Sequence, residues 1–208
     1  MSGKNILKIY NLSTPAERRY GVTWYANAYS DCERIANLFG LPVNVVVGVV
    51  SALSPNNKWE RNIENAHVMC DAFMDGDDIT SFAVSTYNAM KEKAWQILNA
   101  TFVDDDGTTH VLDSEIEKIL NGQKIISFFK CILGYDTCCV VGHALGIYEG
   151  RRFPLTSPSN YINKTKYVEI QNAYSNAGAI TTYRKKSLRA YEMQAITWLT
   201  WKRLHDIN

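Results

Sequence analysis

Four polar side chains stand directly after a strongly apolar stretch, in the run Ser54-Pro55-Asn56-Asn57-Lys58. Hydroxyl, amide and ammonium groups cost free energy when they are buried without hydrogen-bond partners. A polar run at the end of an apolar segment therefore favours a surface that binds or processes a ligand. Trp59 and Arg61 extend the run with an aromatic ring and a cation.

The cysteines do not have the spacing of a metal site. Their number is odd, and no two of them form a Cys-x-x-Cys pair, the spacing typical of zinc and iron–sulfur sites. We therefore expect neither a metal nor a cofactor, and we expect thiols that are buried in a reducing compartment. The five residues are Cys32, Cys70, Cys131, Cys138 and Cys139.

Charge is segregated along the chain, although the formal net charge is only +1. Such a small net charge argues against a protein that coats nucleic acid by bulk electrostatics. Acidic side chains gather at 71–78 and 104–106, whereas residues 184–203 carry six basic side chains against one acidic. A local basic face for the DNA backbone is one interpretation and a solvated surface is the other, and the candidate residues are Arg151, Arg152, Arg184, Lys185, Lys186 and Arg189.

The spacing of apolar residues predicts an all-α, mainly helical protein. It indicates helices over residues 17–38, 60–73, 85–100, 114–120, 125–133, 137–148, 161–177 and 186–205. The valine-rich stretch 43–54 is compatible with a buried strand by propensity and with a helix that begins after Pro42, and the pattern does not decide between them. The acidic, glycine-containing run 104–110 predicts a turn, with a small hairpin near 102–112.

Length and composition predict a single domain over residues 1–208, with two lobes over roughly 20–112 and 113–208. The N-terminal residues lack the pattern of a secretory signal. The longest apolar stretch, 45–50, is far shorter than the roughly 20 residues that a membrane span needs. We expect a soluble, cytoplasmic protein without a membrane partner.

Three segments, in this order, resemble the helix-hairpin-helix DNA glycosylase superfamily, which endonuclease III typifies. GVVSALSPNNKWERNIENA at 48–66 is similar to an early helix–loop–helix of that family, and MKEKAWQIL at 90–98 resembles the helix before its hairpin. LNGQKIISFFKCILGYDTCCVVGHA at 120–144 resembles the hairpin itself and the approach to the family motif V-D-x-H. Nearly the whole chain also resembles phage proteins that pair an LSP…W-x-x-N segment with a QA-x-x-W helix, here at 194–198.

The resemblance implies a two-lobed helical fold whose central cleft accepts a base flipped out of double-stranded DNA. Gly122 would form the hairpin turn that presents backbone N–H groups to a phosphate. Lys124 stands where bifunctional glycosylases place the lysine that attacks the sugar, and the alternative is a lysine that contacts a phosphate or only solvent. Trp59 would stack on a base or fill the gap that a flipped base leaves, or it packs in the core. The phage relatives imply a phage-encoded protein in the host cytoplasm.

One catalytic position departs from the family. Its motif V-D-x-H stands here as Val140-Val141-Gly142-His143. The family aspartate stabilises positive charge on the sugar as the base leaves or activates the nucleophile, and valine does neither. Asp136 is the nearest carboxylate in the sequence that could take this role. Ordinary base excision is therefore disfavoured.

The chain also resembles phage enzymes of this superfamily that hypermodify thymidine, and their reaction is compatible with a valine in place of the family aspartate. In their reaction an amine or amino acid displaces pyrophosphate from an activated hydroxymethyl base, and the bond to the sugar stays intact. This resemblance implies cations that bind the phosphates, and the candidates are Lys58, Arg61 and Lys124. It also implies a base that accepts the proton of the amine, and His143 is the candidate. The alternative for His143 is a half-buried side chain whose hydrogen bonds are made within the fold.

The resemblance also implies that Ser54 and Asn57 line the cleft, beside the flipped base. The alternatives to base hypermodification are a DNA N-glycosylase and a catalytically silent module that binds DNA or a nucleotide in phage–host conflict. The polar run at 54–58 favours an enzyme, and the valine at position 141 favours the silent module.

Overall fold

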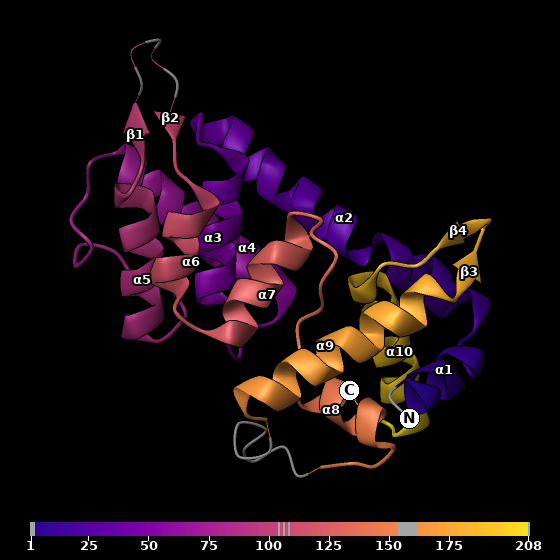
Figure 1. The fold of residues 1–208 in the computed structure, drawn as a ribbon. Coiled ribbons are helices and arrows are strands. Elements are labelled where there is room, and N and C mark those ends of the chain that lie inside the picture. Colours follow the sequence, from indigo (N-terminus) through magenta and orange to yellow (C-terminus); the bar gives the residue numbers. More distant parts are fainter. Residues whose placement is uncertain (1–2, 104, 106, 108, 154–161, 208) are drawn as a thin grey trace. The chain divides into compact units, whose positions relative to one another are not determined.

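The protein is mainly helical, as the spacing of its apolar residues predicted (Figure 1). The computed structural model describes residues 3–103, 105, 107, 109–153 and 162–207. The chain divides into two compact units, of which unit 1 contains Met1–Asn27 and Gly134–Asn208 and unit 2 contains Ala28–Leu133. This division differs from the lobes expected over 20–112 and 113–208, because residues 113–133 pack with the helices that precede them.

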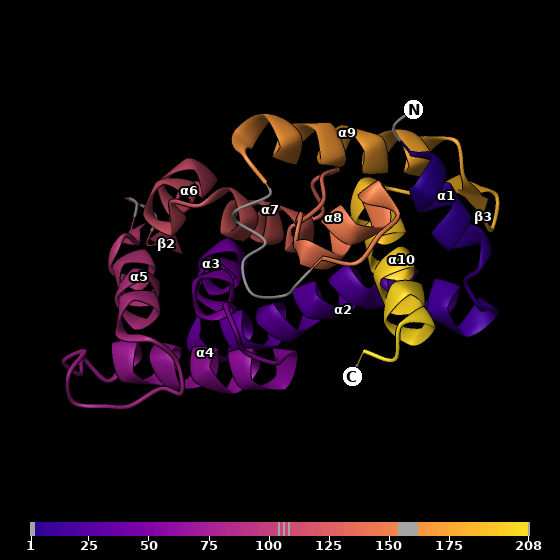
Figure 2. The same ribbon diagram turned by 90° about the horizontal axis from the view of Figure 1, so that it is seen from below.

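Unit 2 is built around one helix, α3. Every residue from Val45 to Leu53 in α3 is buried, and α3 contacts α4, α5, α6 and α7. A helix that is apolar on all sides is stable only when other elements surround it, so packing selects a helix for the valine run that was equally compatible with a strand. Its helices are the second part of α2 (Pro15–Phe39), α3 (Val43–Leu53), α4 (Trp59–Met74), α5 (Asn88–Asn99), α6 (Asp113–Leu120) and α7 (Gln123–Ile132) (Figures 1 and 2).

A small hairpin follows α5, as the sequence predicted for residues 102–112. Strands β1 (Phe102–Val103) and β2 (Thr109–His110) pair antiparallel, with Phe102 opposite His110. Phe102 and Val103 are exposed. Asp104 and Asp106 of the acidic run lie outside the described residues.

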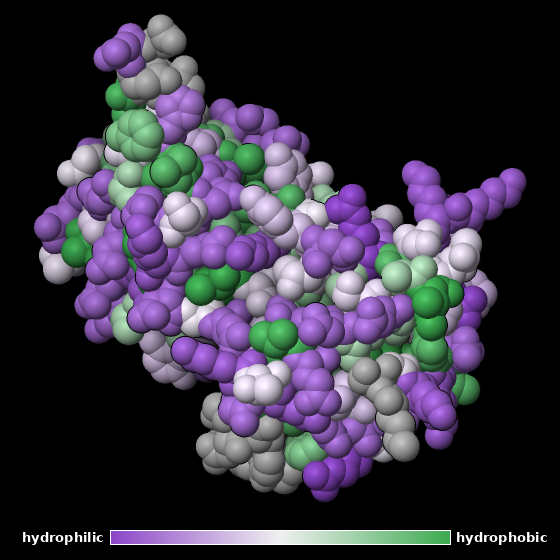
Figure 3. All heavy atoms as spheres, in the orientation of Figure 1, coloured by the Kyte–Doolittle hydropathy of each residue, from purple (hydrophilic) through white to green (hydrophobic). Residues whose placement is uncertain are grey.

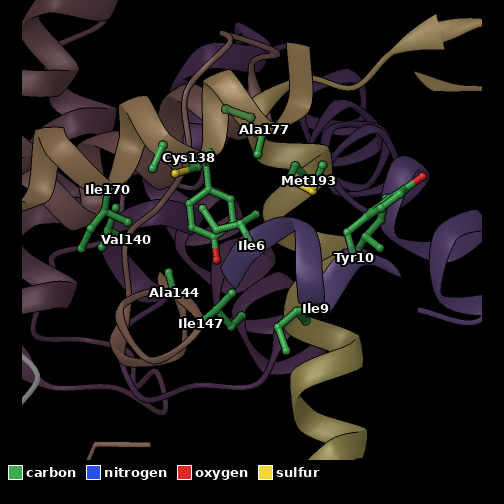
Figure 4. Packing of buried hydrophobic residues seen from close by; sticks show 14 of the residues in the cluster. Ile6, Ile9, Tyr10, Cys138, Val140, Ala144, Ile147, Ile170, Ala177 and Met193 are labelled. Atoms are coloured by element: carbon green, nitrogen blue, oxygen red, sulfur yellow. The ribbon is translucent and has the colours of Figure 1, made fainter. Parts of the chain in front are cut away.

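Unit 1 buries one hydrophobic cluster between four helices and the first part of α2. Figure 4 shows Ile6 and Ile9 of α1 beside Ile147 of α8, and Ile170 of α9 and Met193 of α10 belong to the same cluster. Helix α10 contacts α1, α8 and α9. The elements are α1 (Lys4–Asn11), α8 (Gly142–Glu149), α9 (Lys164–Ala179), β3 (Thr182–Tyr183), β4 (Lys186–Ser187) and α10 (Ala190–Leu204).

Three helices of unit 1 differ from the sequence predictions. Helix α1 was not predicted, and α8 begins at Gly142 instead of residue 137. Helix α10 begins at Ala190 instead of residue 186, because residues 182–187 turn back as a hairpin and the backbone N–H of Arg189, the N-cap residue, donates to Glu192 Oε2 at 2.8 Å. The expected start of α9 at Tyr161 lies outside the described residues.

The cysteines are buried thiols, as predicted. Burial raises the pKa of the Cys32 thiol and of the Cys70 thiol to about 12, so both stay protonated and unreactive at neutral pH. Among the described residues, no group of three or more His, Cys, Asp or Glu side chains could hold a metal ion.

No single helix in the described ranges is long and apolar enough to cross a membrane. Helices α2 and α3 meet that criterion only as a pair, and the pair is bent by 118° at its break.

Glu17 joins the start of α2 to α10 within unit 1. Its carboxylate accepts the Thr14 backbone N–H at 2.7 Å and the Arg203 Nε at 2.7 Å, and the Thr14 hydroxyl accepts the Glu17 backbone N–H at 3.2 Å. The threonine and the glutamate thereby form a capping box. The Arg203 guanidinium is the main cause that lowers the pKa of Glu17 from 4.5 to about 2.

Replacing Glu17 by glutamine should lower the free energy of unfolding at pH 7 by about 1 kcal/mol, since Arg203 is partly exposed and solvent screens the pair. A carboxyl group whose pKa is depressed in the folded state stabilises the protein above its unfolded pKa. That contribution decreases as the pH falls from 4.5 towards 2. Urea unfolding at pH 7, 5 and 3 should therefore show a difference between wild type and Glu17→Gln that shrinks at pH 3, and a constant difference would contradict the assignment.

Candidate functional site

Unit 2 contains the first two segments that carry the family resemblance and residues 120–133 of the third, whose remaining residues, with the start of α8, belong to unit 1. The first segment forms the end of α3, a short loop and the start of α4, the second lies in α5, and the third begins at the junction of α6 and α7. Helix α3 contacts α5, α6 and α7, and Lys93 Nζ of α5 donates to the Leu120 carbonyl oxygen of α6 at 2.7 Å. Segments far apart in sequence therefore meet at the α6–α7 junction.

Only two residues, Asn121 and Gly122, separate α6 from α7, so that the two helices form a helix–turn–helix (Figure 1). Asn121 adopts the left-handed conformation, with φ 43° and ψ 55°, and its N–H donates to the Glu117 carbonyl oxygen at 3.1 Å. Gly122 has extended backbone with φ −174°, and a Cβ there would meet no atom closer than 3.8 Å. The turn that the resemblance places at Gly122 is shared by Asn121 and Gly122, and Asn121 takes its left-handed position because asparagine tolerates that region.

We expect Asn121→Val to lower the free energy of unfolding by about 1–2 kcal/mol, because a β-branched side chain is strained in the left-handed region. Gly122→Ala should change it by less than about 0.5 kcal/mol, since the position has room for a Cβ. Thermal and urea unfolding of the two variants measure these effects. The assignment of the turn fails if the alanine variant is the less stable of the two.

Lys124 lies in the first turn of α7 and is exposed. The first backbone N–H groups of a helix have no partners within the helix, and the helix dipole adds positive potential there. An exposed lysine at this position suits contact with an anion.

The polar loop between α3 and α4 uses two of its side chains to cap α3. Ser54 Oγ donates to the Ser51 carbonyl oxygen at 2.9 Å, and Asn57 Nδ2 donates to the Leu53 carbonyl oxygen at 2.9 Å. These bonds satisfy carbonyl groups that the end of a helix leaves without partners. The structure therefore explains Ser54 and Asn57 by local folding, while Lys58 is exposed at the N-cap of α4.

Trp59 is held between two neighbours in unit 2. Its indole N–H donates to Asp31 Oδ2 at 2.8 Å, and its ring meets Phe128 of α7 edge to face, with the ring centroids 6.4 Å apart. The side chain is half-buried, so packing accounts for much of its environment. Asp31, which also pairs with Arg34, was not singled out in the sequence because it lies 28 residues before Trp59.

Two buried polar atoms beside the loop have no hydrogen-bond partner among the described residues: Ser51 Oγ of α3 and Asn62 Oδ1 of α4. Neither side chain was predicted as a site residue. The only signal in the sequence is that Asn62 ends the W-x-x-N pattern that begins at Trp59. Arg61, one residue before Asn62, is exposed and donates from Nη1 to Ser85 Oγ at 3.1 Å.

His143 is the second residue of α8 in unit 1 and is half-buried. Burial lowers the pKa of its imidazole, and the positive charges of Lys202 and Arg152 lower it further. A pKa below the usual value of His keeps the ring neutral at pH 7, which is the form that accepts a proton.

Val141 and Asp136, the two positions considered for the catalytic carboxylate that the resemblance implies, serve the fold of unit 1. Val141 is the N-cap residue of α8 and packs against the hydrophobic cluster. Asp136 Oδ1 accepts the backbone N–H of Ala190 at 2.8 Å, at the first residue of α10. Capping of α10 therefore accounts for Asp136, which was predicted to be catalytic.

The predicted DNA-backbone residues of unit 1 lie in two places. Arg151 and Arg152 follow α8 and are exposed, with the Arg151 guanidinium 4.4 Å from the centre of the Phe153 ring. Arg184, Lys185 and Lys186 are exposed on the β3–β4 hairpin. Arg189 is the N-cap residue of α10, and its Nη1 donates to the Gly134 carbonyl oxygen at 2.7 Å, so it has a structural role.

In a comparison with known protein families, residues 2–205 match the model of a family of unknown function (DUF7178). Neither the curated proteins nor the solved structures contain a match to the chain.

Proposed function

The chain belongs to the family of unknown function DUF7178, and we propose that it is an enzyme that processes a base flipped out of DNA. The observation that carries the proposal is the α6–α7 helix–turn–helix, with Lys124 exposed in the first turn of α7. Its assembly with the other two resemblance segments in unit 2 supports a relation to helix-hairpin-helix DNA glycosylases.

A DNA phosphate is the anion that this turn suits. Backbone N–H groups at a helix start donate to phosphate oxygens, and a nearby lysine adds a charge that strengthens the contact. Lys58 and Arg61 at the start of α4 supply further exposed cations within unit 2. We assign the DNA contact of unit 2 to these three cations and to the N-terminal turn of α7.

Two observations favour modification of the base over excision. Excision needs a carboxylate that stabilises the charge on the sugar, yet Val141 packs against the hydrophobic cluster and Asp136 accepts the Ala190 N–H. Transfer of an amine to an activated hydroxymethyl base leaves the bond between base and sugar intact and does not need this carboxylate.

In the proposed transfer, the amine nitrogen forms a bond to the methylene carbon of the activated thymidine derivative. The carbon–oxygen bond to pyrophosphate breaks, and pyrophosphate leaves with the electron pair. The proton that the nitrogen releases goes to a base, for which His143 is the candidate because its lowered pKa keeps it neutral. The co-substrate is an amine or an amino acid.

Mass spectrometry of nucleosides tests this function. The full chain is incubated with duplex DNA that carries either thymidine or pyrophosphorylated 5-hydroxymethyl-deoxyuridine, with and without glycine or a diamine. A nucleoside adduct that appears only with the activated base and the amine supports the transfer. A released free base would overturn it and establish the N-glycosylase alternative.

Lys124→Ala should weaken binding to the duplex about tenfold, because it removes one charged contact with a phosphate. Lys118→Ala is the matched control, since Lys118 of α6 is exposed and pairs with Glu115 three residues before it. Equal affinities of the two variants would remove Lys124 from the DNA contact.

A catalytically silent module is the second candidate function. The observation that favours it is that Ser54, Asn57 and Asp136 all make hydrogen bonds within the fold. Tight binding of duplex DNA or of a nucleotide, without any change in the nucleosides, would establish this function in place of the enzyme.

A further inference from the structure

Strands β3 and β4 form a tight hairpin at the edge of unit 1. Thr182 lies opposite Ser187 and Tyr183 opposite Lys186, so that only Arg184 and Lys185 form the loop. Both loop residues have positive φ, of 48° and 68°. Two consecutive positive φ angles in a two-residue loop are the pattern of a type I′ turn.

The residue types in this loop oppose its backbone conformation. Type I′ turns favour Asn-Gly, because asparagine and glycine tolerate the left-handed region and residues with long side chains are strained there. Arg184 and Lys185 occupy both positions. Strain of this kind persists where the surrounding structure imposes it, and it concentrates at functional sites.

The hairpin presents only positive charge. Arg184, Lys185 and Lys186 are all exposed, and the sequence contains no acidic residue between Ile170 and Tyr191. The Arg184 guanidinium lies 5.4 Å from the centre of the Tyr183 ring. Hydrophilic side chains extend from the position of this hairpin in Figure 3.

The base of the hairpin is anchored while its tip is exposed. Leu188 belongs to the buried cluster of unit 1, and its N–H donates to the carbonyl oxygens of Gly178, at 3.2 Å, and of Thr181, at 3.1 Å. The hairpin is therefore a preorganised projection (Figure 1), and a preorganised element loses little conformational entropy when it binds.

We infer that the β3–β4 hairpin is a rigid arm that enters a groove of duplex DNA, with Arg184 and Lys185 at its tip against the phosphates. The major groove of DNA admits a two-stranded β-ribbon, and phosphate contacts by Arg and Lys position a protein on the duplex. The inference rests on the proposed function, which supplies DNA as the binding partner. The new claim is that Arg184 and Lys185 strengthen DNA binding, while their strained backbone lowers the stability of the fold.

One double substitution separates binding from folding. Arg184→Asn with Lys185→Gly installs the residues that a type I′ turn favours and removes two charges. We expect the melting temperature to rise by about 2–6 °C, because the strain of the turn is relieved. We expect affinity for a fluorescently labelled 20-base-pair duplex to fall at least tenfold, with a salt dependence reduced by about two released ions. The matched control is Lys4→Gln with Lys8→Gln, which removes two exposed charges from α1 of the same unit and should leave both quantities unchanged.

Each outcome of fluorescence anisotropy and thermal unfolding decides the inference. A double variant that binds the duplex as tightly as wild type, or that melts at a lower temperature, overturns it and leaves the proposed function standing. Wild-type protein that binds no duplex overturns both. Wild-type protein that binds through the hairpin but forms no modified nucleoside overturns only the enzymatic proposal.

Discussion

Gly178→Ala should lower the free energy of unfolding by about 2–3 kcal/mol, which is among the largest effects expected from a single added methyl group. A Cβ at Gly178 would lie 2.5 Å from the Leu188 carbonyl oxygen and 3.2 Å from its carbonyl carbon. Both atoms belong to the backbone, so no change of side-chain rotamer relieves the clash. Helix α9 and the base of the β3–β4 hairpin would have to separate, and the bond from the Leu188 N–H to the Gly178 carbonyl oxygen would lengthen.

Urea unfolding monitored by circular dichroism measures this effect. Gly122→Ala is the matched control, because a Cβ there would meet no atom closer than 3.8 Å. The prediction accounts for the higher helix propensity of alanine, worth about 1 kcal/mol in a helix interior. A Gly178→Ala protein as stable as wild type would show that α9 does not pack this closely against Leu188.

His143→Gln should reduce formation of the amine adduct by about 10²–10⁴-fold, the usual contribution of a general base. Glutamine keeps much of the size and hydrogen-bonding capacity of histidine but does not accept a proton at neutral pH. His67→Gln is the matched control, because His67 is an exposed histidine of α4. Equal rates for His143→Gln and wild type would show that His143 is a structural residue.

The pH dependence of the rate of adduct formation separates a general base from a structural residue, because a structural His143 would not change it. The neutral imidazole is the active form, so the rate should fall as the pH drops through the pKa of His143. That pKa lies below 6.5, because burial disfavours the charged imidazole and the positive charges of Lys202 and Arg152 disfavour it further. Lys202→Gln removes one of the two cations and should move the acid limb to higher pH. An unchanged acid limb would contradict proton transfer to His143.

The sequence predicted elements whose signals are local. Apolar residues three and four positions apart indicate a helix regardless of the rest of the chain, and the helical class followed from them. The hairpin at 102–110 was predicted by an acidic turn with a glycine. The burial of the cysteines was predicted from their number and spacing, because neither a metal site nor a disulfide framework suited them.

The β3–β4 hairpin was not predicted: residues 182–185 were assigned to no element and β4 to the start of a helix over 186–205, because nothing near Arg184 and Lys185 resembles the Asn-Gly pair of such turns. The anchor of its base is the bond between Leu188 and Gly178, which no local pattern shows. The choice between strand and helix for the valine run 43–54 likewise depended on the four helices that surround α3.

The sequence by itself determined the helical class, the position of the polar loop after α3 and the excess of basic residues near the C-terminus. Only the tertiary structure decided which polar groups are engaged: Asp136 caps α10, 54 residues further along the chain, and Trp59 reaches back to Asp31. The physical reason is that a hydrogen bond depends on atoms within about 3 Å of each other, whereas periodicity and turn chemistry report only on neighbours along the chain. The types of residue that could do chemistry are therefore visible in the sequence, and the partners that hold them are not.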